Sequence, residues 1–210
     1  MKKTFVLIVL FILPLVAYLF FASGVNNFGR LPTLTEEVED MVAISPDVSL
    51  QDKITILGFL GKDADLRKGN AFNLNQKIYK RFYEFHDFQM VMVMPYGTED
   101  VVESIRQELN ELTDASNWKF VFAKDEEIER IFSSLQTDLK LDEGLGTPYV
   151  FIIDKDRNLR GRTDDEDEGT KFGFNTNSVA ELNNKMEDDV KIILAEYRLA
   201  LKRNNAQRSN

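Results

Sequence analysis

The stretch Lys53–Leu66, K-I-T-I-L-G-F-L-G-K-D-A-D-L, decides how this chain folds. Its first part, Ile54–Leu60, is apolar except for one threonine and begins with β-branched residues, as is typical of a central strand buried on both faces of a sheet. The charged loop Lys62–Asp65 follows directly. In open α/β sheets, ligands bind at the carboxyl ends of such strands. We therefore expect a functional site at this loop, although it holds neither a nucleophile nor a soft metal ligand.

Strands and helical patterns alternate downstream of this stretch. Three runs predict further strands, namely Phe88–Met94, Trp118–Phe122 and Tyr149–Ile153. The turn signal Asp154–Asn158 predicts that a fifth strand, Leu159–Arg162, returns antiparallel to the fourth. Ser178 opens a long last helix. This order predicts an α/β domain with a mixed sheet flanked by helices.

The composition excludes several classes of function. The chain has no cysteine, so disulfides, thiol redox catalysis and thiolate copper or zinc sites are impossible. His86 is the only histidine. A lone histidine without Cys or other His residues nearby is more often structural or exposed than a metal ligand. The net charge is −9, from 26 Lys and Arg against 35 Asp and Glu. Nucleic acid is therefore not an expected partner, because phosphate binding relies on clustered basic residues.

The amino-terminal residues predict a membrane anchor. Phe5–Ala22 is almost continuously apolar, and as a helix it would span roughly 27 Å, enough to cross a bilayer. The alternative is a cleaved signal peptide, for which Phe20–Gly24 offers a poor cleavage site. Lys2 and Lys3 precede the span, and the flank beyond it is acidic. We thus expect a single-pass protein of the inner membrane with its carboxyl-terminal domain in the periplasm.

Four segments follow from these patterns. Residues 1–25 are the expected anchor, and residues 26–52 are a tether with edge strands. The globular domain is expected at 53–203, and a flexible tail at 204–210.

The order of elements resembles the thioredoxin-like fold, in the form found in the Sco/SenC family of cytochrome oxidase assembly proteins. Leu57-Gly58-Phe59 matches the strand end that precedes the family's Cys-Pro-x-x-Cys loop, and Thr147-Pro148 falls where the superfamily places a cis-proline. The family is also similar in having one amino-terminal anchor and an exported domain. The resemblance covers roughly Ile54 to Leu201.

This sequence departs from the family at all three copper ligands. The two cysteines fall on Lys62 and Leu66, and the histidine falls on or near Gly146. The resemblance therefore implies the fold without the metal site. We expect no copper, no other cofactor and no catalysis.

The functional hypothesis is a non-catalytic, Sco-like protein that binds a protein partner in the cell envelope, in envelope or respiratory-complex assembly. The candidate partner-binding residues surround the positions of the missing ligands: Lys62, Asp63, Asp65, Leu66, Gly146, Thr147 and Pro148. Two alternatives stay open. One is an envelope enzyme that depends on carboxylates or Ca²⁺, and the other is a structural envelope protein that docks through its last helix.

Both charged stretches also have a purely structural interpretation. The loop after the first core strand can be a solvated one in which Asp65 caps the next helix. The acidic run Asp164–Glu168 carries oxygen ligands of the kind that bind Ca²⁺, but it lacks the spacing of an EF-hand loop. A self-repelling surface loop is the preferred interpretation of that run.

Overall fold

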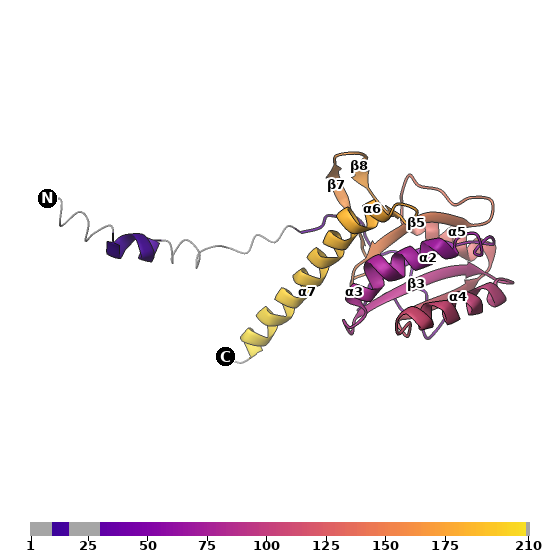
Figure 1. The fold of residues 1–210 in the computed structure, drawn as a ribbon, viewed down its shortest axis with the longest axis horizontal. Helices are drawn as coiled ribbons and strands as arrows, with labels where there is room; N and C mark the ends of the chain where they lie inside the picture. The colour runs from indigo at the N-terminus through magenta and orange to yellow at the C-terminus, as the bar shows by residue number, and fades with distance from the viewer. Residues whose placement is uncertain (1–9, 17–29, 209–210) are drawn as a thin grey trace.

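The structure is a computed structural model that describes residues 10–16 and 30–208, with side chains described as far as residue 200. Within these residues a seven-stranded mixed sheet carries helices on both faces, beside a two-stranded sheet (Figure 1). The strands are β1 (Thr33–Thr35), β2 (Ile54–Leu60), β3 (Phe88–Pro95), β4 (Trp118–Ala123), β5 (Gly146–Ile153), β6 (Leu159–Arg160), β7 (Arg162–Asp165), β8 (Gly169–Lys171) and β9 (Phe174–Asn175). The helices are α2 (Lys68–Leu74), α3 (Lys80–Phe82), α4 (Glu99–Leu112), α5 (Asp125–Ser134), α6 (Val179–Glu181) and α7 (Glu187–Arg208), with π-helical turns η1 (Asn75–Tyr79) and η2 (Leu182–Met186).

The large sheet has the order β1-β6-β5-β2-β3-β4, and β9 adds to β5. β2 pairs parallel with β3 and antiparallel with β5, while β4 extends the parallel part. The predicted mixed sheet and the return of β6 against β5 are confirmed, although β6 ends at Arg160. All seven residues of β2 are buried, as its composition predicted.

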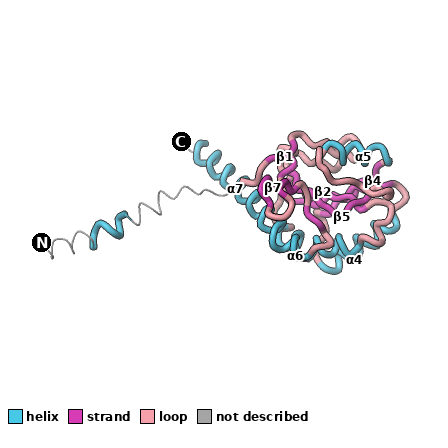
Figure 2. The backbone as a smooth tube through the Cα atoms, turned by 90° about the horizontal axis from the view of Figure 1, so that it is seen from above, coloured by secondary structure: helices cyan, strands magenta, loops and turns pink. Residues whose placement is uncertain are grey.

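The sheet buries two separate apolar layers. Alternate residues of a strand face opposite sides, so Ile54 and Ile56 pack under α2, α4 and α7, while Leu57 and Phe59 pack toward α5. Figure 2 shows α5 on one side of the strands and α4 and α6 on the other. A mixed sheet flanked by helices in this way fits the α/β thioredoxin-like fold.

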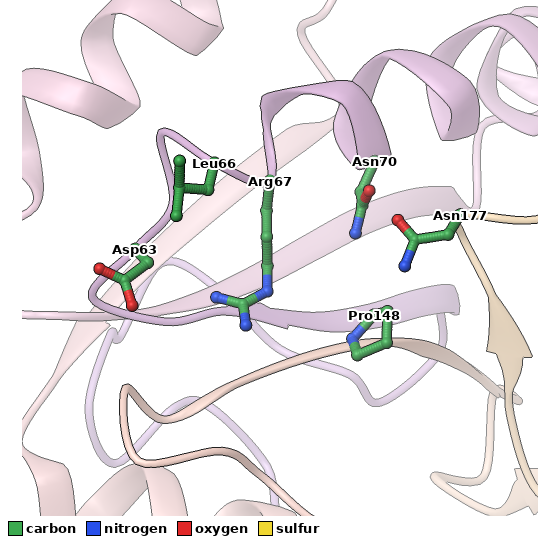
Figure 3. Close-up of a pocket in the computed structure, with 6 residues that line it drawn as sticks. All are labelled: Asp63, Leu66, Arg67, Asn70, Pro148 and Asn177. Atoms are coloured by element: carbon green, nitrogen blue, oxygen red, sulfur yellow. The ribbon is translucent and has the colours of Figure 1, made fainter.

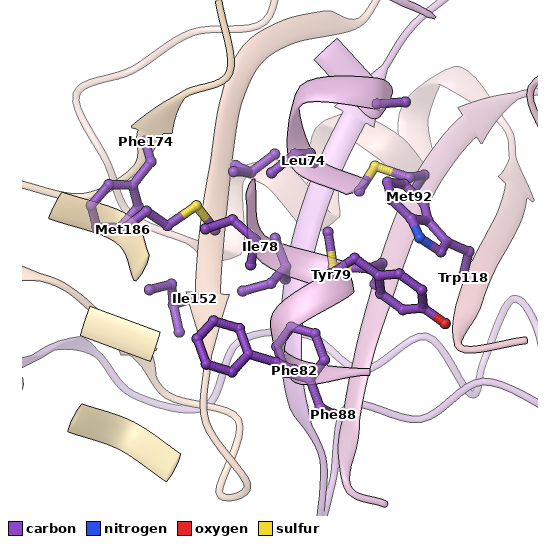
Figure 4. Close-up of a cluster of buried hydrophobic side chains, with 14 of the residues drawn as sticks. Leu74, Ile78, Tyr79, Phe82, Phe88, Met92, Trp118, Ile152, Phe174 and Met186 are labelled. Carbon is purple, nitrogen blue, oxygen red and sulfur yellow. The ribbon is translucent and has the colours of Figure 1, made fainter. Parts of the chain in front are cut away.

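Aromatic side chains dominate the layer under α2 and α3 (Figure 4). Phe82 meets Phe88 edge to face at 5.9 Å, and the rings of Tyr79 and Trp118 lie 5.7 Å apart. Tyr79 is fully buried, and its hydroxyl donates to the Asp114 carbonyl at 2.7 Å. Each such ring contributes about 1.5–3 kcal/mol through burial. This layer fixes η1 and α3 over the sheet.

A hairpin that the sequence did not predict follows β6. β7 and β8 pair antiparallel, and the acidic run forms the end of β7 and the turn to β8. Lys185 binds both Asp165 and Asp167, and Lys171 binds Glu168. The run lies at the surface as expected, but three of its carboxylates are paired with lysines of β8 and η2, so it is not simply self-repelling.

The amino-terminal prediction falls largely outside the described residues. Residues 10–16 are helical. Across residues 10–16 and 30–208, no helix is both long enough and apolar enough to cross a membrane. The anchor at Phe5–Ala22 stays a prediction.

Residues just before β2 belong to the packed structure. β1 pairs antiparallel with β6 at the sheet edge, which confirms one predicted edge strand. Val38, Met41 and Leu50 are fully buried in the apolar layer on the α5 side. This segment therefore covers part of the sheet face that carries α5. On that face the described residues form no second long helix.

Candidate functional site

The carboxyl end of β2 lies directly beside the start of β5. Leu60 is in register with Gly146, and the Lys62 amide donates to the Gly144 carbonyl at 2.7 Å. Gly61 has a φ of +71°, and a Cβ there would lie 2.6 Å from the Gly144 oxygen. Glycine is required at this position, because any side chain would push the two segments apart. The structure thus brings the two halves of the predicted site together.

An arginine and an aspartate tie these two segments to each other. Arg67 precedes α2; its Nη1 donates to the Leu60 carbonyl at 2.9 Å, and its Nη2 pairs with Asp142. The other oxygen of Asp142 accepts from the amides of Gly144 and Gly146, at 2.9 and 3.0 Å. We call Arg67 and Asp142 the clamp. It holds the loop after β2 and the loop before β5 in one arrangement.

Gly146 leaves the room that the clamp needs. A Cβ at this position would lie 2.6 Å from Arg67 Nη1 and 2.8 Å from the Leu60 oxygen. Contacts that short are forbidden, so only glycine lets the guanidinium cross above β5.

The rest of the β2 loop faces solvent. Lys62 pairs with Asp125 of α5 at 2.7 Å, and both side chains are about half exposed. Asp65 pairs with Lys68 at 3.0 Å, and this hydrogen bond raises the pKa of the Lys68 ammonium. Leu66 is 84% exposed, more than the other exposed large apolar residues of the globular part. The interpretation that Asp65 caps the helix is wrong, since α2 begins after Arg67 without any side-chain cap.

A pocket of about 330 Å³ opens between the start of α2 and β5. It is lined by Asp63, Leu66, Arg67, Asn70, Pro148 and Asn177 (Figure 3). In this view the amides of Asn70 and Asn177 point into the space above Pro148, with Arg67 between them and Asp63.

The predicted site residues occupy three different settings. Asp63, Leu66 and Pro148 line the pocket; Gly146 and Thr147 are buried in β5 beside it; Lys62 and Asp65 lie on the exposed loop. The Thr147–Pro148 peptide bond is trans, which corrects the cis-proline that the resemblance implied.

Sequence reasoning missed four residues of this site. Asp142 comes from the loop before β5, Arg67 directly precedes α2, Asn70 lies in α2, and Asn177 lies in the turn before α6. No local pattern marks the two asparagines. The pair of glycines at 144 and 146 was the one available signal that another group approaches the backbone there.

The side chains at this site are groups that can bind a ligand. Among the described residues, no group of three or more His, Cys, Asp or Glu side chains is placed to hold a metal ion. His86 is exposed and lies at the other end of the sheet's parallel strands, paired with Asp87 before β3. Lys155, followed by His86, lowers the pKa of the Asp87 carboxyl. The strand-end site itself offers amides, a guanidinium, a carboxylate and apolar surface.

Comparison with known proteins finds distant similarity to solved structures. No family model and no curated protein matches the sequence. Among similar solved structures, BsSco of the Sco family of cytochrome c oxidase assembly proteins shares 15% identity, at a TM-score of 0.49 over 77% of this chain and 95% of that one. A thioredoxin-family thiol:disulfide interchange protein from Chlorobium tepidum shares 17% identity, at a TM-score of 0.44 over 79% of this chain and 98% of that one. Bradyrhizobium japonicum ScoI with copper bound shares 12% identity, at a TM-score of 0.38 over 69% of this chain and 87% of that one.

The solved structures that this chain resembles are thus Sco-family and thioredoxin-like proteins, as the order of its elements predicted. The chain itself contains no cysteine. Every identity is 17% or less and every TM-score is 0.49 or less, so the likeness is distant and function has to be argued from the site.

Proposed function

We propose that this protein is a membrane-anchored, non-catalytic thioredoxin-like module whose strand-end site binds a protein partner in the periplasm. The setting implied by the resemblance is the assembly of a respiratory or other envelope complex. The anchor keeps the domain at the membrane surface, where such complexes assemble.

One observation carries the proposal: the site is held rigid by a charged clamp and still presents an exposed leucine. The Arg67–Asp142 clamp fixes the loop, and Leu66 stands 84% exposed at its edge. A rigid loop loses little entropy on association, and an apolar side chain on it can serve as an anchor. With no cysteine in the chain, thiol exchange is excluded and recognition remains.

Site-specific crosslinking in membranes tests this function. A photo-reactive amino acid replaces Leu66 in the full chain, and the matched control replaces Leu112, an exposed apolar residue at the end of α4. We expect Leu66 to capture a defined envelope protein that Leu112 does not capture. Identical captures from both positions, or none from Leu66, would contradict partner binding at this site.

A copper titration tests the non-catalytic, metal-free part of the proposal. Calorimetry of the full chain with Cu⁺ should show no tight binding, because neither thiolate nor a pair of imidazoles is available. Tight stoichiometric Cu⁺ binding would show that the site has another ligand set and would overturn this part. The same experiment with Ca²⁺ addresses the carboxylate-dependent alternative.

A further inference from the structure

The pocket at the strand-end site contains an amide that bonds to no described residue. Asn70 is 8% exposed as a whole residue, and within the described residues its carboxamide makes no hydrogen bond. Three residues further along the helix, Asn73 donates to the Thr176 carbonyl at 3.0 Å. The nitrogen and oxygen of this amide are not among the fully buried polar atoms that lack a partner, so they are open to the pocket and available to a ligand. Figure 3 shows the Asn70 amide directed into the pocket.

The groups around Asn70 favour a neutral ligand over an ion. Asn177 adds a second amide with both a donor and an acceptor, opposite Asn70. The guanidinium of Arg67 disfavours a cation, and its charge is already matched by Asp142. The unpaired carboxylate of Asp63 on the other side disfavours an anion. A ligand group with a strong dipole and no net charge is repelled by neither Arg67 nor Asp63.

The shape of the pocket suits one side chain with an apolar stem. Pro148 forms its floor, and Leu66 lies at its mouth, so methylene groups would find contacts there. A volume of about 330 Å³ is enough for a single polar side chain and its surroundings.

We propose that this pocket receives a primary carboxamide side chain, Gln or Asn, carried by an extended segment of the partner protein. A carboxamide is self-complementary: its oxygen accepts from one asparagine while its NH₂ donates to the other. This inference rests on the proposed function and adds the chemistry by which the partner is recognised.

Side-chain amide NMR on the full chain in detergent micelles tests the proposal. The probes are blocked tripeptides, acetyl-Ala-X-Ala-amide, with Gln, Glu, Lys or Ala at X. We expect the Gln peptide to shift the NH₂ signals of Asn70 and Asn177, and to bind about tenfold more tightly than the other three, as one or two net neutral hydrogen bonds provide. Equal binding of the Ala peptide would mean that the main chain is recognised, and tighter binding of Glu or Lys would mean that an ion is. Either result, or no shift at these asparagines, overturns the proposal.

Two variants and a control distinguish a loss of amide recognition from a loss of folding. Asn70→Leu keeps the volume and should abolish the preference for Gln over Ala, while Asn183→Leu, an exposed asparagine of η2, should keep it. Asn177→Ala lies on an exposed turn and should reduce the preference without any risk to folding. If Leu66 still captures a partner but the Gln peptide shows no preference, the proposed function stands and this inference fails.

Discussion

Charged groups in this protein are arranged in two contrasting regions, the β7–β8 hairpin with its helix and the strand-end site. In the first, the charges are buried and paired: Lys171 is 1% exposed and contacts Glu168 and Glu181, and Arg162 binds Asp189 through two 2.8 Å hydrogen bonds. In the second, Lys62 and Asp125 pair in the open, and Asp63 and Asn70 make no polar side-chain contact with the described residues. The same residue types therefore hold the fold together in the first region and face solvent or the pocket in the second.

The difference shows how to tell a structural charge from one available for binding. A buried ion that loses its partner is strongly unfavourable, so every member of the hairpin network has to be matched within the chain. Exposed pairs contribute little to stability, so the strand-end groups can remain free for a ligand. Substitutions in the two regions should therefore separate by the size of their effect on stability.

The largest effect is expected from Arg162→Met. This change leaves the Asp189 carboxylate, 2% exposed, without its cation, and it should lower the free energy of unfolding by about 3–5 kcal/mol. Burial raises the pKa of the Asp189 carboxyl even against the pull of Arg162. A protonated Asp189 needs no cation, so the loss should shrink as the pH falls toward that raised pKa. Urea unfolding of the full chain at several pH values measures this.

The matched control is Lys191→Met on the same helix. Lys191 is half exposed, and its buried partner Glu187 keeps a second cation in Arg81, so removal of Lys191 should cost much less than removal of Arg162. Equal losses for the two variants would remove the distinction between the regions.

The second effect concerns packing at the strand-end site. Gly146→Ala would place a methyl group 2.8 Å from the Leu60 oxygen and against Arg67, and we expect a loss of about 2 kcal/mol. In contrast, Gly69→Ala in α2 meets nothing within 4 Å and should stabilise the protein by up to about 1 kcal/mol. Thermal unfolding compares them. A harmless Gly146→Ala would mean that the clamp is not fixed as described.

The third effect is a pH dependence from the hairpin. Burial raises the pKa of the Asp165 carboxyl, but hydrogen bonds from Lys185 and from the amides of Asp167 and Glu168 outweigh it, so the net pKa is lowered. Its stabilisation is present above the unfolded pKa of about 4 and is lost as the pH falls through the folded value. Asp165→Asn should cost about 1.5 kcal/mol at neutral pH, and the cost should shrink as the pH falls below the unfolded pKa of about 4. A constant difference across that range would contradict the role of its charge.

How much of this could be predicted from the sequence also differs between the regions. β2 and β3 are apolar runs that are buried on both faces, so local composition was sufficient for them. β7 and β8 read Arg-Thr-Asp-Asp and Gly-Thr-Lys, without apolar alternation, and form because η2 and α7 supply Lys185 and Asp189. At the site, the loop after β2 was predicted from the end of its strand. The convergence of Asn70 and Asn177 on Pro148 depends on the folded chain and left no local signal.

The smallest effect on stability, and the sharpest contrast, is expected within one helix. Asn70→Leu replaces an amide that is open to the pocket and bonds to no described residue, so it should change the free energy of unfolding by less than about 0.5 kcal/mol. Asn73→Leu removes the hydrogen bond to the Thr176 carbonyl and should lower it by about 1 kcal/mol. Chemical unfolding of both variants measures the difference. If Asn70→Leu proved the more damaging change, the amide would have a structural role, and the argument that it is kept free for a ligand would lose its basis.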